Sequence, residues 1–404
     1  MGREIALSFD PLNLSSAFYE DPFPTYHALR TWDPVRRCPD GSYFLTRYDD
    51  LAAIYKDPGR FSSDKKREFA PKFGASPLYE HHTTSLVFND PPLHTRVRRL
   101  IAGALTPAAI AGMEPDLVKL VDELLDAAED KGRIDLIEDF AGAIPVEVIG
   151  NLLDVPRSER GPLRGWSLAI LGALEPVVSE EAMARGNAAV VDFLDYLRGL
   201  VAARRRRPGD PRSDVLTRLI RGEADGERLS ETELLQNCIF ILNAGHETTT
   251  NLIGNGLVSL CAWPDERRRL IEDQGLIKTA VEEVLRFESS NQLGNRITTE
   301  AVEIGGVELP AETRVTLCIG AANRDPAHFP EPDRFDVGRT PNRHLAFAAG
   351  PHVCVGLSLA RLEGRVAIGR FLARFPDYVL AGEAQRARRA RFRSFVSVPL
   401  SVRP

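Results

Sequence analysis

The chain has 404 residues, of which 43% are hydrophobic and 27% charged, a balance that excludes a disordered, collagen-like or low-complexity protein. Its 51 lysines and arginines against 57 aspartates and glutamates give a net charge of −6, which argues against a nucleic-acid binder that relies on phosphate neutralisation. The five cysteines are widely spaced without a C-x-x-C pair, so we expect neither a disulfide framework nor a zinc knuckle, and a reducing cytoplasm is the predicted location.

The first half of the chain is predicted to be mainly helical. The start, MGREIALSFDPLNL, lacks the apolar run of a secretion signal or anchor, and no stretch of ~18 apolar residues predicts a membrane span. The four arginines at 204–207 are interpreted as a solvated helix end, with an anion-binding patch as the alternative. Apolar residues three or four apart predict helices over 115–128, 146–153, 188–203 and 214–220.

The longest predicted helix covers residues 231–263 and would measure ~50 Å. A capping box at Ser230-Glu231-Thr232-Glu233 opens it, and Pro264 ends it. Its middle reads Ala244-Gly245-His246-Glu247-Thr248-Thr249-Thr250, where glycine and threonine weaken helix propensity. Small residues let a flat ligand approach the backbone, and a Thr hydroxyl not bonded to its own helix could face that ligand. The alternative is a polar helix face with a tolerated glycine.

Beyond Arg296 the pattern changes to short β-branched runs around Gly305-Gly306 and Pro310, which predict hairpins. Helical spacing returns over 357–375, and a β-rich patch over 391–402 closes the chain. The predicted fold is therefore mainly α with small β-sheets, and residues 1–404 are expected to form a single domain.

The most specific pattern surrounds Cys354. The chain reads Phe347-Ala348-Ala349-Gly350-Pro351-His352-Val353-Cys354-Val355-Gly356 and then enters a predicted helix. A cysteine just before a helix N-terminus lies where backbone N–H groups and the helix dipole favour the thiolate, so it is a metal ligand or a nucleophile. Gly350 and Gly356 permit a tight loop around the sulfur.

This pattern resembles the cysteine loop of the soluble bacterial cytochromes P450, which are haem-thiolate monooxygenases. Phe347, Gly350, Cys354 and Gly356 match it position by position, and Cys354 stands where the axial ligand of the haem iron belongs. The resemblance covers nearly the whole chain and implies the cytochrome P450 fold, with haem between the long central helix and the cysteine loop. Ala348 stands where the family often has glycine, at a cost of ~1 kcal/mol if φ is positive there.

Three further groups of residues carry the resemblance. The stretch Ala244-Gly245-His246-Glu247-Thr248 is similar to the oxygen-activation motif, which implies a proton relay at Glu247 and a hydrogen-bonding hydroxyl at Thr248, while His246 is interpreted as hydrogen-bonded filler. The second group consists of the residues expected to bind the haem propionates, which are His94, Arg98, Arg296 and His352. The third group is a structural Glu-x-x-Arg set of Glu283, Arg286 and Arg334.

The resemblance implies insertion of one oxygen atom of O2 into a C–H bond of a small, mostly apolar molecule with a polar handle, using haem b. The chain has no cysteine cluster and no G-x-G-x-x-G after a strand. Electrons from NAD(P)H are therefore expected through a separate ferredoxin or flavodoxin with its reductase. We expect a monomer. The residues proposed for the substrate pocket are Asn291, Gln292, Leu293 and Phe395, with the alternative that the amides only satisfy backbone groups.

Other classes remain open at this point. A non-catalytic haem-thiolate sensor or a peroxide-driven member of the same fold would keep Cys354 but has no need of Glu247 and Thr248. A hydrolase with Cys354 as nucleophile and His352 as base fails sterically if both flank one tight loop residue.

Overall fold

The computed structural model describes residues 2–210, 214–224 and 227–403, and most of them lie in helices. The α-helices are α1 (Gly2–Ser8), α2 (Ser16–Glu20), α3 (Phe23–Trp32), α4 (Tyr48–Lys56), α5 (Lys66–Phe73), α6 (Pro77–Thr84), α7 (Leu93–Ala104), α8 (Pro107–Lys131), α9 (Ala143–Leu152), α10 (Gly161–Gly172), α11 (Glu180–Arg206), α12 (Val215–Arg221), α13 (Glu231–Ala262), α14 (Pro264–Glu272), α15 (Ile277–Phe287), α16 (Ile319–Ala322) and α17 (Leu357–Arg374). Short helical turns are η1 (Leu86–Phe88), η2 (Leu136–Ala141), η3 (Arg157–Glu159), η4 (Gln274–Leu276) and η5 (Gly350–His352).

The strands are short and lie in five small sheets. The largest sheet has the order β1-β2-β10-β7-β3, a second has the order β11-β14-β4, and the pairs β12-β13, β5-β6 and β8-β9 form the rest. The strands are β1 (Val35–Arg37), β2 (Tyr43–Leu45), β3 (Phe61–Ser62), β4 (Arg133–Asp135), β5 (Glu223–Ala224), β6 (Glu227–Arg228), β7 (Leu293–Thr298), β8 (Val302–Ile304), β9 (Val307–Leu309), β10 (Arg314–Cys318), β11 (Val379–Leu380), β12 (Gln385–Arg386), β13 (Phe395–Ser397) and β14 (Pro399–Ser401).

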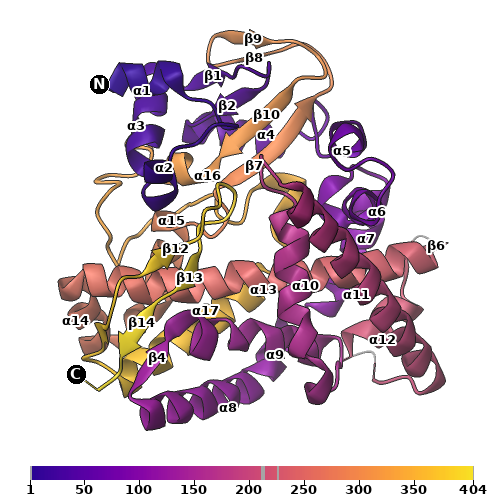
Figure 1. Cartoon of the computed structure of the whole chain (residues 1–404), viewed down its shortest axis with the longest axis vertical. Coiled ribbons are helices and arrows are strands. Elements are labelled where there is room, and N and C mark those ends of the chain that lie inside the picture. Colours follow the sequence, from indigo (N-terminus) through magenta and orange to yellow (C-terminus); the bar gives the residue numbers. More distant parts are fainter. Residues whose placement is uncertain (1, 211–213, 225–226, 404) are drawn as a thin grey trace.

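Helix α13 crosses the molecule as a long central rod, with α8 and α17 on one side and the five-stranded sheet beyond it on the other (Figure 1). The predicted capping box is confirmed, because the Ser230 side chain accepts from the Glu233 N–H and the Glu233 side chain accepts from the Ser230 N–H. Most side chains of α13 are buried against α9, α10, α11 and α17. A polar segment in its middle therefore lies deep inside the protein.

Other predicted elements are also present. The windows 115–128, 146–153 and 188–203 fall on α8, α9 and α11, and the Gly305-Gly306 turn joins β8 to β9. The arginine run ends α11, where Arg204 forms ion pairs with Asp154 and Asp214, and Arg205 pairs with Glu231. These contacts support the helix-end interpretation. Among the described residues, no helix has both the length and the apolarity to cross a membrane.

The main hydrophobic core surrounds α13 and extends from Phe69 to Val402, so it joins the N-terminal helices to the last strand. A smaller core lies between the five-stranded sheet and α4, and it includes Leu51, Tyr55 and Val315. The loop before α17 reaches this second core through Ala348 and Ala349. The cysteine loop is thus held between both cores.

Candidate active site

The loop that carries Cys354 is fixed by its own backbone. The Cys354 N–H donates to the Phe347 carbonyl over 2.9 Å, and α17 begins three residues after Cys354. Burial raises the pKa of the Cys354 thiol, while the Gly356 N–H and the charges of Arg98 and Arg361 oppose that shift. These same donors would stabilise a thiolate once a metal ion displaces the proton.

Two residues of this loop have left-handed backbone angles. Gly350 has φ +66°, and a Cβ there would collide with the Tyr55 carbonyl of α4, so only glycine fits. Ala348 has φ +57°. Because φ is positive at Ala348, the loop carries about 1–2 kcal/mol of backbone strain at this alanine.

A group of cationic and neutral donors lies beside the loop. The rings of His94 and His352 are 3.9 Å apart between centroids, and the charges of Arg98 and Arg296 act on His352. Burial, with these neighbouring groups, lowers the pKa of His352 to about 3. Among the described residues, both ring nitrogens of His94 lack a hydrogen-bond partner, and so does Nε2 of His352.

These four residues are the expected propionate partners, and the structure brings them together. The nearby carboxylate of Asp90 acts on His94 and Arg296, but it accepts its hydrogen bonds from the Ser62 hydroxyl and the Ser63 N–H. Haem brings two carboxylates of its own. Orphaned donors on His94 and His352 and the guanidinium groups of Arg98 and Arg296 therefore fit the propionates of a haem that Cys354 would ligate.

Helix α13 presents an accessible strip in its middle. Ala244 is exposed and Gly245 and Thr248 are partly exposed, although their neighbours on the helix are buried. The Thr248 hydroxyl donates to the Ala244 carbonyl over 2.7 Å. The sequence analysis required a threonine hydroxyl that is free of its own helix, and the Thr248 hydroxyl does not meet that requirement. Its oxygen can still accept a hydrogen bond from a group in the open site.

Glu247 is buried and paired with a residue from the C-terminal region. The Arg389 guanidinium donates to Oε1 of Glu247, while Oε2 has no partner among the described residues. Burial raises the pKa of Glu247 to about 7, and the charge of Arg389 opposes that shift. A carboxyl group with this pKa can both take up and release a proton near neutral pH.

Sequence reasoning missed the residues that hold Arg389. Its Nε donates to Oε1 of Glu175 over 3.1 Å, and Oε2 of Glu175 accepts from the backbone N–H groups of Ala390 and Arg391. The segment between α10 and α11 carries Glu175, so three distant parts of the chain meet at Glu247. Neither Glu175 nor Arg389 lies in a motif, so no local sequence signal marks either residue.

His246 forms no hydrogen bond with this network among the described residues. It is buried, and neither ring nitrogen has a partner among the described residues. Burial lowers its pKa to about 3, and the nearest charge acting on it is Arg164 of α10. The interpretation of His246 as hydrogen-bonded filler is therefore corrected, because the hydrogen bonds are missing.

The proposed pocket residues separate in the structure. Gln292 donates to the Ser289 carbonyl over 2.6 Å and packs against Gly320 of α16. Leu293 lies in a third core with Phe44, and Phe395 lies under the Arg386 guanidinium at 3.6 Å. Leu293 and Phe395 are thus packed into hydrophobic surroundings, whereas Oε1 of the buried Gln292 has no partner among the described residues.

Asn291, like Gln292, has a buried side-chain oxygen without a partner among the described residues. It pairs with Phe392 in an isolated β-bridge, and its Oδ1 has no partner within the described chain. Asn291 therefore remains a candidate for the pocket wall.

The Glu-x-x-Arg set is present with one correction. Glu283 and Arg286 form a fully buried bidentate pair with both distances at 2.8 Å. Arg334 joins only through its carbonyl, because its guanidinium is half exposed and contacts Glu331. The second arginine on Glu283 is Arg339, at 3.2 Å.

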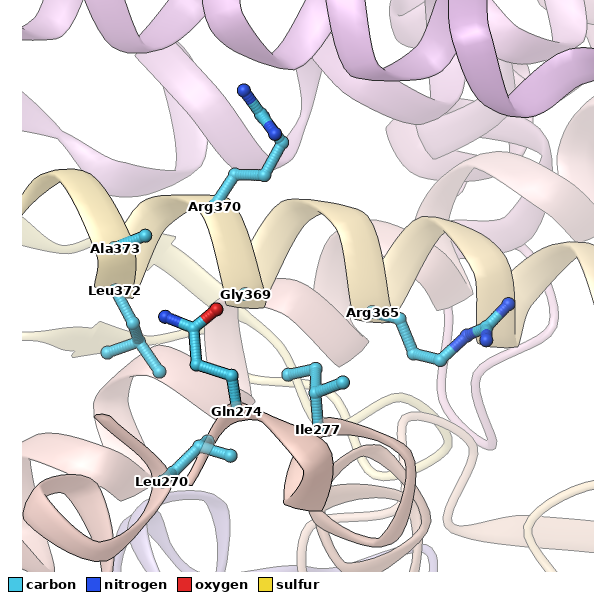
Figure 2. A pocket seen from close by; sticks show the side chains of 8 residues that line it. All are labelled: Leu270, Gln274, Ile277, Arg365, Gly369, Arg370, Leu372 and Ala373. Carbon is cyan, nitrogen blue, oxygen red and sulfur yellow. The ribbon is translucent and has the colours of Figure 1, made fainter. Parts of the chain in front are cut away.

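A separate surface pocket lies along α17. It has a volume of about 210 Å³ and is lined from α14, η4, α15 and α17, with Gln274 and Ile277 facing Gly369 of α17 (Figure 2). Arg370 points away from it to Asp122 of α8. The residues that line it include neither Cys354 nor Thr248, so this pocket is distinct from the candidate active site.

Comparison with known proteins identifies the family. The cytochrome P450 family model matches residues 173–399. The chain is 41% identical over 371 residues to vitamin D(3) 25-hydroxylase of Pseudonocardia autotrophica, covering 91% of this chain and 89% of that protein. It is 37% identical over 382 residues to 6-deoxyerythronolide B hydroxylase of Saccharopolyspora erythraea, covering 92% of each.

Solved structures agree with these relatives. P450BioI in complex with an acyl carrier protein ligated to hexadec-9Z-enoic acid superposes with a TM-score of 0.90 at 35% identity, covering 96% of this chain and 100% of that chain. The predicted fold class, mainly α with small sheets, is thereby confirmed. This chain belongs to the cytochrome P450 family and is a haem-thiolate monooxygenase, an oxidoreductase that uses O2 and reducing equivalents.

Proposed function

We propose that this monooxygenase inserts one oxygen atom of O2 into a C–H bond of a mid-sized, mostly apolar molecule that carries a polar handle. The observation that carries this proposal is the accessible strip of Ala244, Gly245 and Thr248 beside the buried acid Glu247. A sensor or a peroxide-driven enzyme has no use for a proton-transferring acid at this place. The pair therefore favours a reaction driven by O2 and an electron donor.

The cofactor in this proposal is haem b. Cys354 supplies the iron ligand, and His94, Arg98, Arg296 and His352 hold the two propionates. When bound, haem with a thiolate ligand supplies the activation of O2, because the thiolate donates electron density that favours O–O cleavage. Phe347, Gly350 and Gly356 shape the loop that orients the sulfur.

The protein's own residues deliver protons. Thr248 donates to the Ala244 carbonyl and keeps its lone pairs for a hydrogen bond from water or a protonated group. Glu247 holds a proton on its free Oε2 near neutral pH, since burial raises its pKa to about 7. Arg389 orients Glu247 through Oε1. A proton can thus move from Glu247 toward the site that Thr248 borders.

Electrons come from NAD(P)H through a ferredoxin or flavodoxin and its reductase. Two arginines near the cysteine loop are exposed. Arg99 lies on α7, whose His94 packs against His352 of the loop, and Arg343 lies shortly before Phe347 in the chain. Positive charge there suits an acidic electron carrier. We also propose that residues 1–404 act as one domain and as a monomer in the cytoplasm, which the continuous core from Phe69 to Val402 supports for the domain.

Isotope labelling tests this function. The haem-loaded enzyme is combined with ferredoxin, its reductase and NADPH under ¹⁸O₂, with compounds chosen by their shift of the iron spin state. The proposal requires one ¹⁸O atom in the product and NADPH use that depends on substrate. Product labelled from water, or equal turnover with hydrogen peroxide alone, would contradict it.

A further inference from the structure

Two partly buried cations, Lys72 of α5 and Arg391 between β12 and β13, have only neutral hydrogen-bond partners. The Lys72 ammonium donates to the backbone carbonyl of Glu175 over 2.7 Å, and the Arg391 guanidinium donates to Oδ1 of Asn295. Among the described residues, neither cation forms an ion pair with a carboxylate. Burial, together with the charge of Arg391, lowers the pKa of Lys72 to about 8. Glu68 and Glu175 act on both cations without pairing with either, so an anion in direct contact would stabilise them further.

Both cations are held at the same loop. Glu175 accepts from Lys72 through its carbonyl and from the backbone N–H of Arg391 through its carboxylate. That carboxylate is already committed to Arg389 and to two backbone N–H groups. The other nearby acid, Glu68, pairs with Lys65 over 2.7 Å. Among the described residues, neither carboxylate forms an ion pair with Lys72 or with Arg391.

An unpartnered histidine adjoins them. His82 of α6 is 1% exposed, and neither ring nitrogen has a hydrogen-bond partner among the described residues. Its pKa lies well below 6.5, because burial and the charges of His81, Lys72 and Arg391 disfavour the protonated ring. A neutral imidazole still donates one N–H. The site thus combines two cations with one orphaned donor.

Apolar rings line the same place. The His82 ring lies 5.7 Å from Phe69, 5.3 Å from Phe73 and 5.7 Å from Phe88 between centroids. The Lys72 ammonium lies 5.3 Å from the centroid of Phe73. A ligand here would meet charge at one end and aromatic carbon along its body.

We propose that Lys72, Arg391 and His82 bind the carboxylate of an acidic substrate, so that the polar handle is an anion. This inference rests on the proposed function. Arg391 offers the planar fork that suits a carboxylate, and Lys72 adds a point charge. Arg389 lies next to this site and also reaches Glu247, so the bound carboxylate and the accessible strip of α13 lie on connected parts of the protein. The apolar body then extends toward Ala244 and Thr248, and the oxidised C–H bond is remote from the acid.

Bifunctional imidazole ligands test the proposal without knowledge of the substrate. An ω-(imidazol-1-yl)alkanoic acid anchors its ring on the haem iron and presents its carboxylate at a distance set by the methylene chain. The matched ω-(imidazol-1-yl)alkanol differs only in charge. Dissociation constants for both series, from short to long chains, are read from the shift of the Soret band.

At the best chain length the acid should bind about ten- to one-hundredfold more tightly than the alcohol. Lys72→Met and Arg391→Met should each reduce that preference to about twofold or less. Arg67→Met is the matched control, because Arg67 lies on the same helix, loses the same charge and is exposed on its side chain. It should keep the full preference.

Equal binding of acid and alcohol at every chain length in the unaltered enzyme would overturn the proposal. So would an Arg391→Met enzyme that loses haem and weakens both series alike, since Arg391 would then serve a haem propionate. The proposed haem site is tested separately by the appearance of any imidazole-induced Soret shift. Failure of that shift contradicts the haem site, whereas a shift without acid preference contradicts only the anion site.

Discussion

The Arg389 guanidinium donates to the Glu247 carboxylate across a separation of 142 residues in the chain. The same guanidinium is held by Glu175 at 3.1 Å, so the acid beside Thr248 is positioned by two segments outside its own helix. Protonation of Glu247 therefore depends on a residue of the C-terminal region.

Removal of Arg389 should change the pH dependence of turnover. Arg389 lowers the pKa of Glu247, which burial has raised to about 7, so Arg389→Met should raise that pKa further. If protonated Glu247 delivers the proton, activity falls as pH rises through this pKa. The alkaline limb of kcat should then move upward by about one pH unit, and Arg389→Lys should restore most of its position. An alkaline limb that stays in place, or moves to lower pH, would contradict the role of Glu247.

Thr248→Ala should separate electron use from product formation. The hydroxyl borders the accessible strip of α13, and its loss removes a hydrogen-bond acceptor from the proton path. We expect substrate affinity within about twofold of the original, while product per NAD(P)H falls about tenfold and hydrogen peroxide accumulates. Quantifying peroxide and product from the same reaction checks this. Unchanged coupling would remove Thr248 from the mechanism.

Arg334 and Arg339, which follow each other closely in the chain, should differ in their effect on stability. Arg339 donates to the fully buried Glu283, whereas the Arg334 side chain is half exposed on Glu331. Arg339→Ala should lower the free energy of unfolding by about 3 kcal/mol, and Arg334→Ala by about 0.5 kcal/mol or less. Urea titrations followed by the Soret band compare the two. A larger loss for Arg334→Ala would restore the original prediction.

Reduction by the electron carrier should depend on salt. Arg99 and Arg343 are exposed near the cysteine loop, and attraction between exposed charges is screened over ~8 Å at physiological ionic strength. The rate of reduction by an acidic ferredoxin should fall as salt rises, and Arg343→Glu should slow it at low salt. A rate independent of ionic strength would instead indicate an apolar interface.

Sequence reasoning was sufficient where the signal is local. The capping box at Ser230 and the stop at Pro264 define α13 almost to the residue, and the glycine pair at Gly305 defines a hairpin. The Cys354 loop is also a local pattern. In such segments neighbouring residues determine the backbone, so the sequence alone carries the prediction.

Other features depend on how distant segments meet. Arg334 and Arg339 lie in one irregular segment, and only the path of the chain decides which side chain reaches Glu283. Gln292, predicted as a pocket residue, packs on Gly320 and uses Nε2 on the Ser289 carbonyl, while its Oε1 has no partner among the described residues. The pairing of Glu247 with Arg389 has no local signature. Tertiary contacts of this kind are not encoded in periodicity or propensity.

The central claim is that Cys354 ligates haem iron as a thiolate, and the absorption spectrum of the reduced carbon monoxide complex tests it most directly. The unaltered protein should show a strongly red-shifted Soret band, which electron donation from a thiolate produces. Cys354→His should abolish that band, while Cys261→Ser, a change at a partly buried cysteine outside the loop, should retain it. A red-shifted band that persists in Cys354→His would contradict the account.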